Sequence, residues 1–226
     1  MIPLKDDNPT RSVPFVTVAL ILANAVVFVY ELLLPPEASK ILIAGLGVTP
    51  VRLTQALLHD PAQLGHAGVT LLTAMFLHGN IPHVVLNMLY LWIFGNNIED
   101  VVGHGRFVLF YLVCGLVASF AQVAAAPHSK VPMIGASGAI SGVLGAYLVM
   151  FPAARVLTLV FLVFFFRVIS FPAIIVLGFW FLLQLINAGQ MGPGGGVAVL
   201  AHIGGFVAGL TLIPAFRRRR SRQSLY

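Results

Sequence analysis

Charged side chains are scarce in this chain. Asp, Glu, Lys and Arg make up 9% of its 226 residues, whereas 59% of the residues are hydrophobic. Soluble domains carry about 25% charged residues, so the composition excludes an ordinary soluble domain. It indicates a polytopic membrane protein, and we expect an all-α fold.

Acidic residues and cysteine are rarer still. No Asp or Glu follows Asp100, so the later apolar segments hold no carboxylate ligand for a metal. No His-Glu-x-x-His pattern occurs either, which disfavours a metalloprotease. The single cysteine, Cys114, excludes an intrachain disulfide and a thiolate cluster, and we expect it to be inert packing. We expect neither a metal nor a cofactor.

Six apolar segments are candidate membrane spans. The first covers about 22 residues, about 33 Å as a helix, and lacks a small-residue cleavage pattern, so we expect an uncleaved span and no removable signal peptide. The long connection that follows predicts a short interfacial helix at 51–58 and an apolar piece at 69–77 lying at the interface. The predicted spans are 13–34, 81–98, 107–126, 132–151, 171–187 and 197–216.

The span count depends on the apolar region 153–188, which hydropathy reads as one span or as two. With six spans, ten of the 13 basic residues face the cytoplasm, and only Lys40, Arg52 and Lys130 lie outside. Seven spans would place the C-terminal arginines outside if the N-terminus stays inside, against the positive-inside rule. We therefore expect 154–170 to be an apolar cytoplasmic loop. The predicted parts are a cytoplasmic N-terminus at 1–12, a six-helix membrane domain at 13–216 and a cytoplasmic tail at 217–226, whose arginines contact anionic lipid and no nucleic acid.

Ser137 lies between glycines within the fourth predicted span, and His202 lies in the sixth. Each is about five residues into its predicted helix, roughly 7 to 8 Å below the helix start at 1.5 Å per residue. Both helices descend from the outer face, so the two side chains can meet. His83 and Asn87, four residues apart, share one face of the second span at a similar depth.

These groups predict a serine protease site inside the bilayer. A serine hydroxyl becomes a nucleophile when an imidazole takes its proton, so we assign Ser137 as nucleophile and His202 as base. The oxyanion needs preorganised donors, for which the candidates are the Ser137 backbone N–H, the Asn87 amide and the His83 ring. Since no acid lies near the sixth span, we expect a dyad, with packing, a hydroxyl or water orienting the imidazole.

Three motifs resemble those of the rhomboid family of intramembrane serine proteases. They read HGNIPHVVLN at 78–87, GASG at 135–138 and AHIGG at 201–205. The resemblance implies a six-helix bundle, a Ser137 and His202 dyad, an oxyanion hole using His83 and Asn87, and transmembrane proteins as substrates. It also implies a first loop that is partly embedded in the membrane, and a structural motif at Gly95 and Glu99.

The chain departs from the family pattern in two places. Many members have Trp-Arg before a stretch that here reads VTLLTAMF at 69–76. Some members carry an aromatic residue four positions after the nucleophile, where this chain has Ser141. The group that packs on His202 therefore stays open.

Glycines and a further histidine accompany the site. We expect Gly142, Gly145 and Gly209 to serve helix packing, because small residues four apart let membrane helices approach closely. We count Gly135, Gly138 and His78 as supporting residues. Gly138 is expected to leave room for substrate, and His78 is expected to be structural or loop-bracing.

The predicted substrate enters between the second and fifth helices and unwinds near its outer end. We expect a multi-pass protein of the cell membrane whose active site opens to the outer face, with the glycine-rich turn at 192–196 giving mobility above the site. One alternative is a non-catalytic rhomboid-like protein that binds transmembrane clients. Another is a small-solute channel or transporter, which internal repeats would favour, and we find none.

Overall fold

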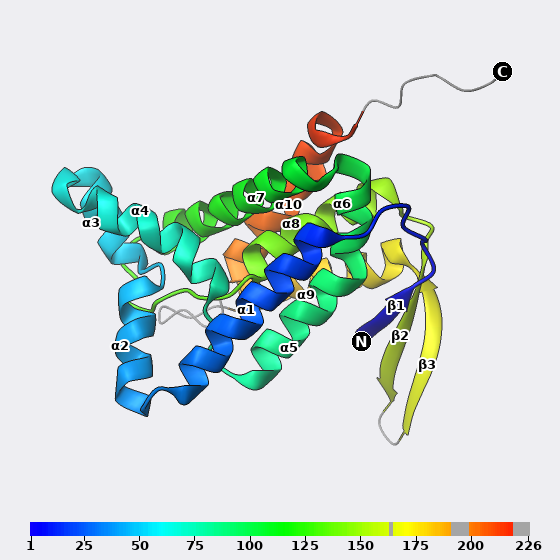
Figure 1. Cartoon of the computed structure of the whole chain (residues 1–226), viewed down its shortest axis with the longest axis horizontal. Helices are drawn as coiled ribbons and strands as arrows, with labels where there is room; N and C mark the ends of the chain where they lie inside the picture. The colour runs from blue at the N-terminus through cyan, green and yellow to red at the C-terminus, as the bar shows by residue number, and fades with distance from the viewer. Residues whose placement is uncertain (163–164, 191–198, 219–226) are drawn as a thin grey trace.

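The fold is a bundle of helices with a small sheet at one side. A computed structural model describes residues 1–162, 165–190 and 199–218. In Figure 1 the helices of the first loop lie at the opposite side of the bundle from the sheet. The main helices are α1 (Phe15–Leu33), α5 (Ile81–Tyr90), α6 (Asn96–Val102), α7 (His104–Ala125), α8 (Ser137–Met150), α9 (Ala173–Gly189) and α10 (Val199–Phe216).

The first loop is helical over most of its length. A helix is confirmed where one was predicted at 51–58, and the adjoining apolar piece also folds into helix. Whether this loop enters a membrane stays a prediction. Its elements are α2 (Pro36–Leu46), α3 (Pro50–Leu58), η1 (Pro61–Gln63), α4 (Leu64–Thr73) and η2 (Ala74–Phe76).

The apolar helices make the chain a multi-pass membrane protein. Among the described residues, α1, α7 and α10 are long and apolar enough to cross a bilayer. The helices of Pro61–Phe76 and Ile81–Val102, joined by an 82° bend, add a fourth span when taken together. At 1.5 Å per residue α8 and α9 rise only about 21 and 26 Å, less than the roughly 30 Å of a hydrocarbon core, so six spans stay a prediction.

Small residues bring α8 and α10 into backbone contact. A Cβ on Gly145 would lie 2.1 Å from the carbonyl oxygen of Phe206, and one on Gly209 would lie 1.8 Å from that of Gly142. The packing role expected for Gly142, Gly145 and Gly209 is confirmed. Gly138 also serves helix packing, because a Cβ there would lie 2.7 Å from the Cβ of Ala118 on α7. That Gly138 leaves room for substrate stays a prediction.

A three-stranded antiparallel sheet corrects the all-α prediction. Its strands are β1 (Ile2–Asp6), β2 (Arg155–Leu162) and β3 (Phe165–Pro172), in the order β1-β2-β3. The region read as an apolar loop at 154–170 is thus a hairpin, to which the N-terminal segment adds a strand. Its Val, Ile, Thr and Phe residues favour strands, because their side chains pack well on a pleated surface.

A buried carboxylate joins the start of α1 to α6. Glu99 is fully buried and accepts hydrogen bonds from the backbone N–H groups of Val16 and Thr17, at 2.9 and 2.7 Å, and from the Thr17 hydroxyl. Between α5 and α6 lies the π-helical turn η3 (Leu91–Gly95), where a Cβ on Gly95 would lie 3.3 Å from Thr17. These contacts confirm the structural role expected for Gly95 and Glu99.

Candidate active site

Ser137 is the first residue of α8, whereas the predicted span began five residues before it. The segment before it is extended, held by paired hydrogen bonds between Val48 and Met133 and by a 2.8 Å bond from the Gly135 N–H to the carbonyl of Ala74. Gly135 has φ of +118°, which a helix cannot contain, so the helix starts after it. Ser137 therefore stands at the helix N-terminus, where backbone N–H groups lack intrahelical acceptors and attract negative charge.

His202 is held at the start of α10 by a neighbouring helix. The Gln122 side chain of α7 accepts hydrogen bonds from the backbone N–H groups of Leu200 and Ala201, at 3.1 and 3.2 Å. These are among the N–H groups that a helix start leaves without a partner. Gln122 thereby fixes the position from which His202 projects.

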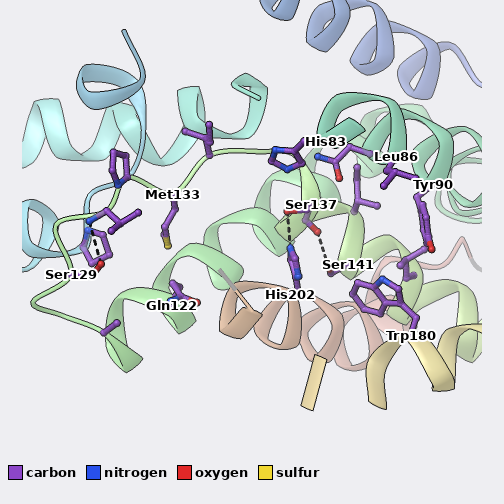
Figure 2. Close-up of a pocket in the computed structure, with 18 of the residues that line it drawn as sticks. His83, Leu86, Tyr90, Gln122, Ser129, Met133, Ser137, Ser141, Trp180 and His202 are labelled. Carbon is purple, nitrogen blue, oxygen red and sulfur yellow. Dashed lines mark hydrogen bonds between the residues drawn. The ribbon is translucent and has the colours of Figure 1, made fainter. Parts of the chain in front are cut away.

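The hydroxyl of Ser137 and the ring of His202 meet directly. The Ser137 Oγ lies 2.8 Å from His202 Nε2, and Figure 2 shows the two side chains pointing toward one another. The other ring nitrogen, Nδ1, lies 3.0 Å from Oε1 of Gln184 on α9. An amide oxygen can only accept a hydrogen bond, so Nδ1 carries the proton and Nε2 is free to accept the one from Ser137.

The imidazole is therefore oriented by an amide, whereas packing, a hydroxyl or water was expected in this role. Trp180 also contacts it, with ring centroids 6.0 Å apart. Ser141 does not take the place of an aromatic partner, because its hydroxyl donates to the carbonyl of Ser137 at 2.6 Å. Gln184 and Trp180 lie one turn apart on α9. A polar residue inside an apolar span is a signal for a functional site, and this signal could have identified Gln184.

The side chains of α5 lie beside the backbone that leads into Ser137. A Cβ on Gly135 would lie 2.7 Å from His83 Nε2 and 3.6 Å from Asn87 Nδ2. At this position glycine is needed twice, for its positive φ and for the close approach of these two side chains. The two side chains expected as oxyanion donors thus lie beside the backbone two residues before Ser137.

Asn80 and His78 organise these donors. The Asn80 side chain caps α5 by accepting a 2.9 Å hydrogen bond from the backbone N–H of His83. Asn87 is buried, and its Nδ2 donates to His78 Nε2 at 3.0 Å, which leaves its second N–H hydrogen available. His78 is also buried, and its backbone N–H donates to the Glu31 carboxylate at 3.1 Å. This placement agrees with the bracing role expected for His78.

A cavity of about 600 Å³ contains the site. Its lining includes Ser137, His202, His83 and Asn87. Leu86 and Tyr90 from α5 and Trp180 from α9 line it on one side of Ser137 and His202, and Gln122, Ser129 and Met133 line it on the other (Figure 2). One end of the cavity thus lies between α5 and α9. The turn at 192–196, expected above the site, lies outside the described residues.

Comparisons with known proteins show which family the chain is similar to. The model of the rhomboid domain matches residues 66–219. Rhomboid protease GluP of Bacillus subtilis is 38% identical over 158 residues, 66% of this chain and 28% of GluP. The mitochondrial Rhomboid protein 1 of Saccharomyces cerevisiae is 31% identical over 97 residues, 41% of this chain and 28% of that protein.

A further Bacillus subtilis relative, the putative rhomboid protease YdcA, is 34% identical over 80 residues, 35% of this chain and 40% of that protein. The chain thus spans well under half the length of these relatives. The family match nevertheless covers more than half of the chain, including all three motifs and the helices that carry Ser137, His202, His83 and Asn87. The chain belongs to the rhomboid family.

Proposed function

We propose that this protein is an intramembrane serine endopeptidase that cleaves transmembrane segments of other membrane proteins. The observation that carries the proposal is the 2.8 Å contact between Ser137 Oγ and His202 Nε2. It joins a nucleophile to a base whose proton-accepting nitrogen faces it. The protease names of two relatives, GluP and YdcA, support the same activity.

The reaction follows from the positions of the groups. His202 Nε2 takes the hydroxyl proton as Ser137 Oγ attacks the scissile carbonyl carbon. The negative charge that forms on the carbonyl oxygen is met by the Ser137 N–H, the Asn87 amide and the His83 ring. The imidazolium then gives its proton to the leaving amine, and an acyl-enzyme remains. Water attacks this ester with His202 again as base, which releases the second product and restores Ser137.

The substrate reaches the dyad through the space between α5 and α9. A transmembrane helix hides its backbone, so the segment must unwind before Ser137 can attack it. Small or helix-destabilising residues near its outer end lower that cost, because a bilayer penalises unpaired backbone groups. The substrate is therefore cleaved near the outer face. The protease itself is a multi-pass protein of the cell membrane, and both of its termini are cytoplasmic.

The test is cleavage of a labelled single-span substrate by the full chain in detergent. We expect the parent protein to cut the substrate, and the Ser137→Ala and His202→Ala variants to lose activity by about 10³-fold or more. Cleavage by Ser137→Ala at the parent rate would contradict the proposal. Binding of the substrate without any cleavage by the parent would instead support a non-catalytic, client-binding protein.

A further inference from the structure

Gln184 occupies the place that a carboxylate holds in a Ser-His-Asp triad. Its Oε1 lies 3.0 Å from His202 Nδ1, on the opposite side of the ring from Ser137. The seven acidic residues of the chain all lie at or before Asp100, so the last two apolar helices offer His202 no carboxylate. An amide oxygen is the acceptor that this site provides.

We propose that Gln184 is a positioning residue for the dyad, holding His202 in the tautomer and orientation that let it act as a base. The inference rests on the proposed protease function and deepens it. A neutral imidazole carries one proton, and an acceptor at Nδ1 keeps that proton there. Nε2 then presents its lone pair to the Ser137 hydroxyl. Without the acceptor, the proton can sit on Nε2, and a ring in that form cannot take a proton from Ser137.

A neutral amide also suits a site among apolar helices. A carboxylate beside His202 would have to leave water, which costs several kcal/mol unless other groups compensate. The amide gives the same directional acceptor without that cost. It stabilises the imidazolium less than a carboxylate would, and this difference makes the two groups distinguishable by experiment.

Through Gln184, α9 takes part in the geometry of His202. Trp180 and Gln184 lie one helical turn apart, and both touch His202. Trp180 at the same time lines the cavity between α5 and α9. Helix α9 therefore both lines the proposed substrate path and orients the base. If α9 moved, Gln184 would move away from His202 Nδ1.

The experiment compares three variants of the full chain in detergent. Gln184→Leu removes the acceptor with little change in size, Gln184→Glu restores an acceptor with a charge, and Asn187→Leu is the control. Asn187 is an exposed amide three residues further along α9. For each variant kcat, KM, the pH profile of kcat and the thermal unfolding midpoint are measured on the labelled single-span substrate.

We expect Gln184→Leu to lower kcat by at least about tenfold with KM changed less than twofold, because proton transfer and not binding is impaired. Gln184→Glu should recover most of the parental kcat and move the acidic limb of the profile to higher pH, because its carboxylate holds a proton on His202 more strongly. Asn187→Leu should behave as the parent.

The shift in the profile is assigned by comparison with the parent, since other groups facing His202 are common to all variants. These are Ser137 and Ser141 from α8, Trp180 from α9 and His83 from α5. Of these side-chain types only imidazole, that of His83, has an ordinary pKa near neutral pH. Because His83 is unchanged in each variant, a change in the acidic limb reports the group at position 184.

Two outcomes would overturn the inference. One is a parental kcat and pH profile in Gln184→Leu. The other is a Gln184→Glu variant whose kcat is as low as that of Gln184→Leu and whose pH profile keeps the parental acidic limb. That result would give Gln184 a structural role only. Either outcome leaves the proposed function intact as long as Ser137→Ala is inactive. An active Ser137→Ala would instead remove the function itself.

Discussion

The amide of Asn87 donates to the ring of His78 across 3.0 Å in the buried interior beside α5. This contact fixes the direction of one Asn87 N–H and thereby of the other, which faces the backbone before Ser137. We expect Asn87→Ala to lower kcat by about 10²- to 10³-fold, the usual effect of losing one oxyanion donor. His78→Leu should lower it less, because the donor remains but turns more freely.

The two substitutions should not be additive, because they act through one N–H group. The measurement is a double-mutant cycle on kcat with the single-span substrate. Additive losses in the double variant would show that His78 does not work through Asn87.

Gly135→Ala tests the backbone before the nucleophile. Its φ of +118° is strained for alanine, and the new Cβ would lie 2.7 Å from His83 Nε2. We expect a lower unfolding midpoint and a loss of activity greater than the loss of folded protein. Gly105→Ala is the control, because a Cβ there meets no atom within 4 Å. Parental activity in Gly135→Ala would contradict the geometry described here.

Glu99→Gln tests the link between α1 and α6. The variant keeps the shape of a side chain that accepts bonds from Val16 and Thr17 but removes its charge. Hydrogen bonds to charged groups contribute about 1.5 to 3 kcal/mol, so thermal unfolding in detergent should show a loss of this order. The matched control is Glu37→Gln, whose exposed pair with Lys40 contributes little. Equal midpoints for the two variants would refute the anchoring role.

The partly buried carboxyl of Asp6 in β1 predicts a pH dependence of stability. Its carboxylate accepts hydrogen bonds from Tyr147 and Asn97, at 2.6 and 2.8 Å, while burial raises the pKa of this carboxyl above the usual value. A raised pKa means that the folded state holds the proton more tightly than the unfolded chain. The resulting stability is present at low pH and is lost as the pH rises from about 4 through the folded pKa.

Unfolding midpoints of the parent and of Asp6→Asn, measured over this pH range, check the sign. The parent should lose stability relative to the variant as the pH rises, because an amide does not ionise. A difference between the two proteins that stays constant with pH, or that changes in the opposite direction, would contradict the assignment.

The residues of the dyad and the packing glycines could be read from the sequence because their signals are local. Ser137 lies in a glycine motif, His202 in a second one, and Gly145 and Gly209 in small-residue repeats. The helices were also predictable, since an apolar run that crosses a bilayer has few other conformations. The start of α8 was placed five residues too early, because hydropathy does not register the positive φ of Gly135.

Other features depend on contacts between distant segments. The sheet joins β1 to a hairpin more than 140 residues later. By hydropathy, the apolar strands of that hairpin cannot be distinguished from an apolar loop or from a membrane span. Gln184 meets His202 only because α9 and α10 pack side by side. An amide in an apolar helix indicates that a partner exists, but the sequence does not say which one.

Reaction of the full chain with a fluorophosphonate, mapped by mass spectrometry of its peptides, tests the central claim most directly. We expect a covalent adduct on Ser137 that disappears in His202→Ala, because the hydroxyl is a nucleophile only beside its base. An adduct on Ser141 in place of Ser137, or undiminished labelling of Ser137 in folded His202→Ala, would contradict the account.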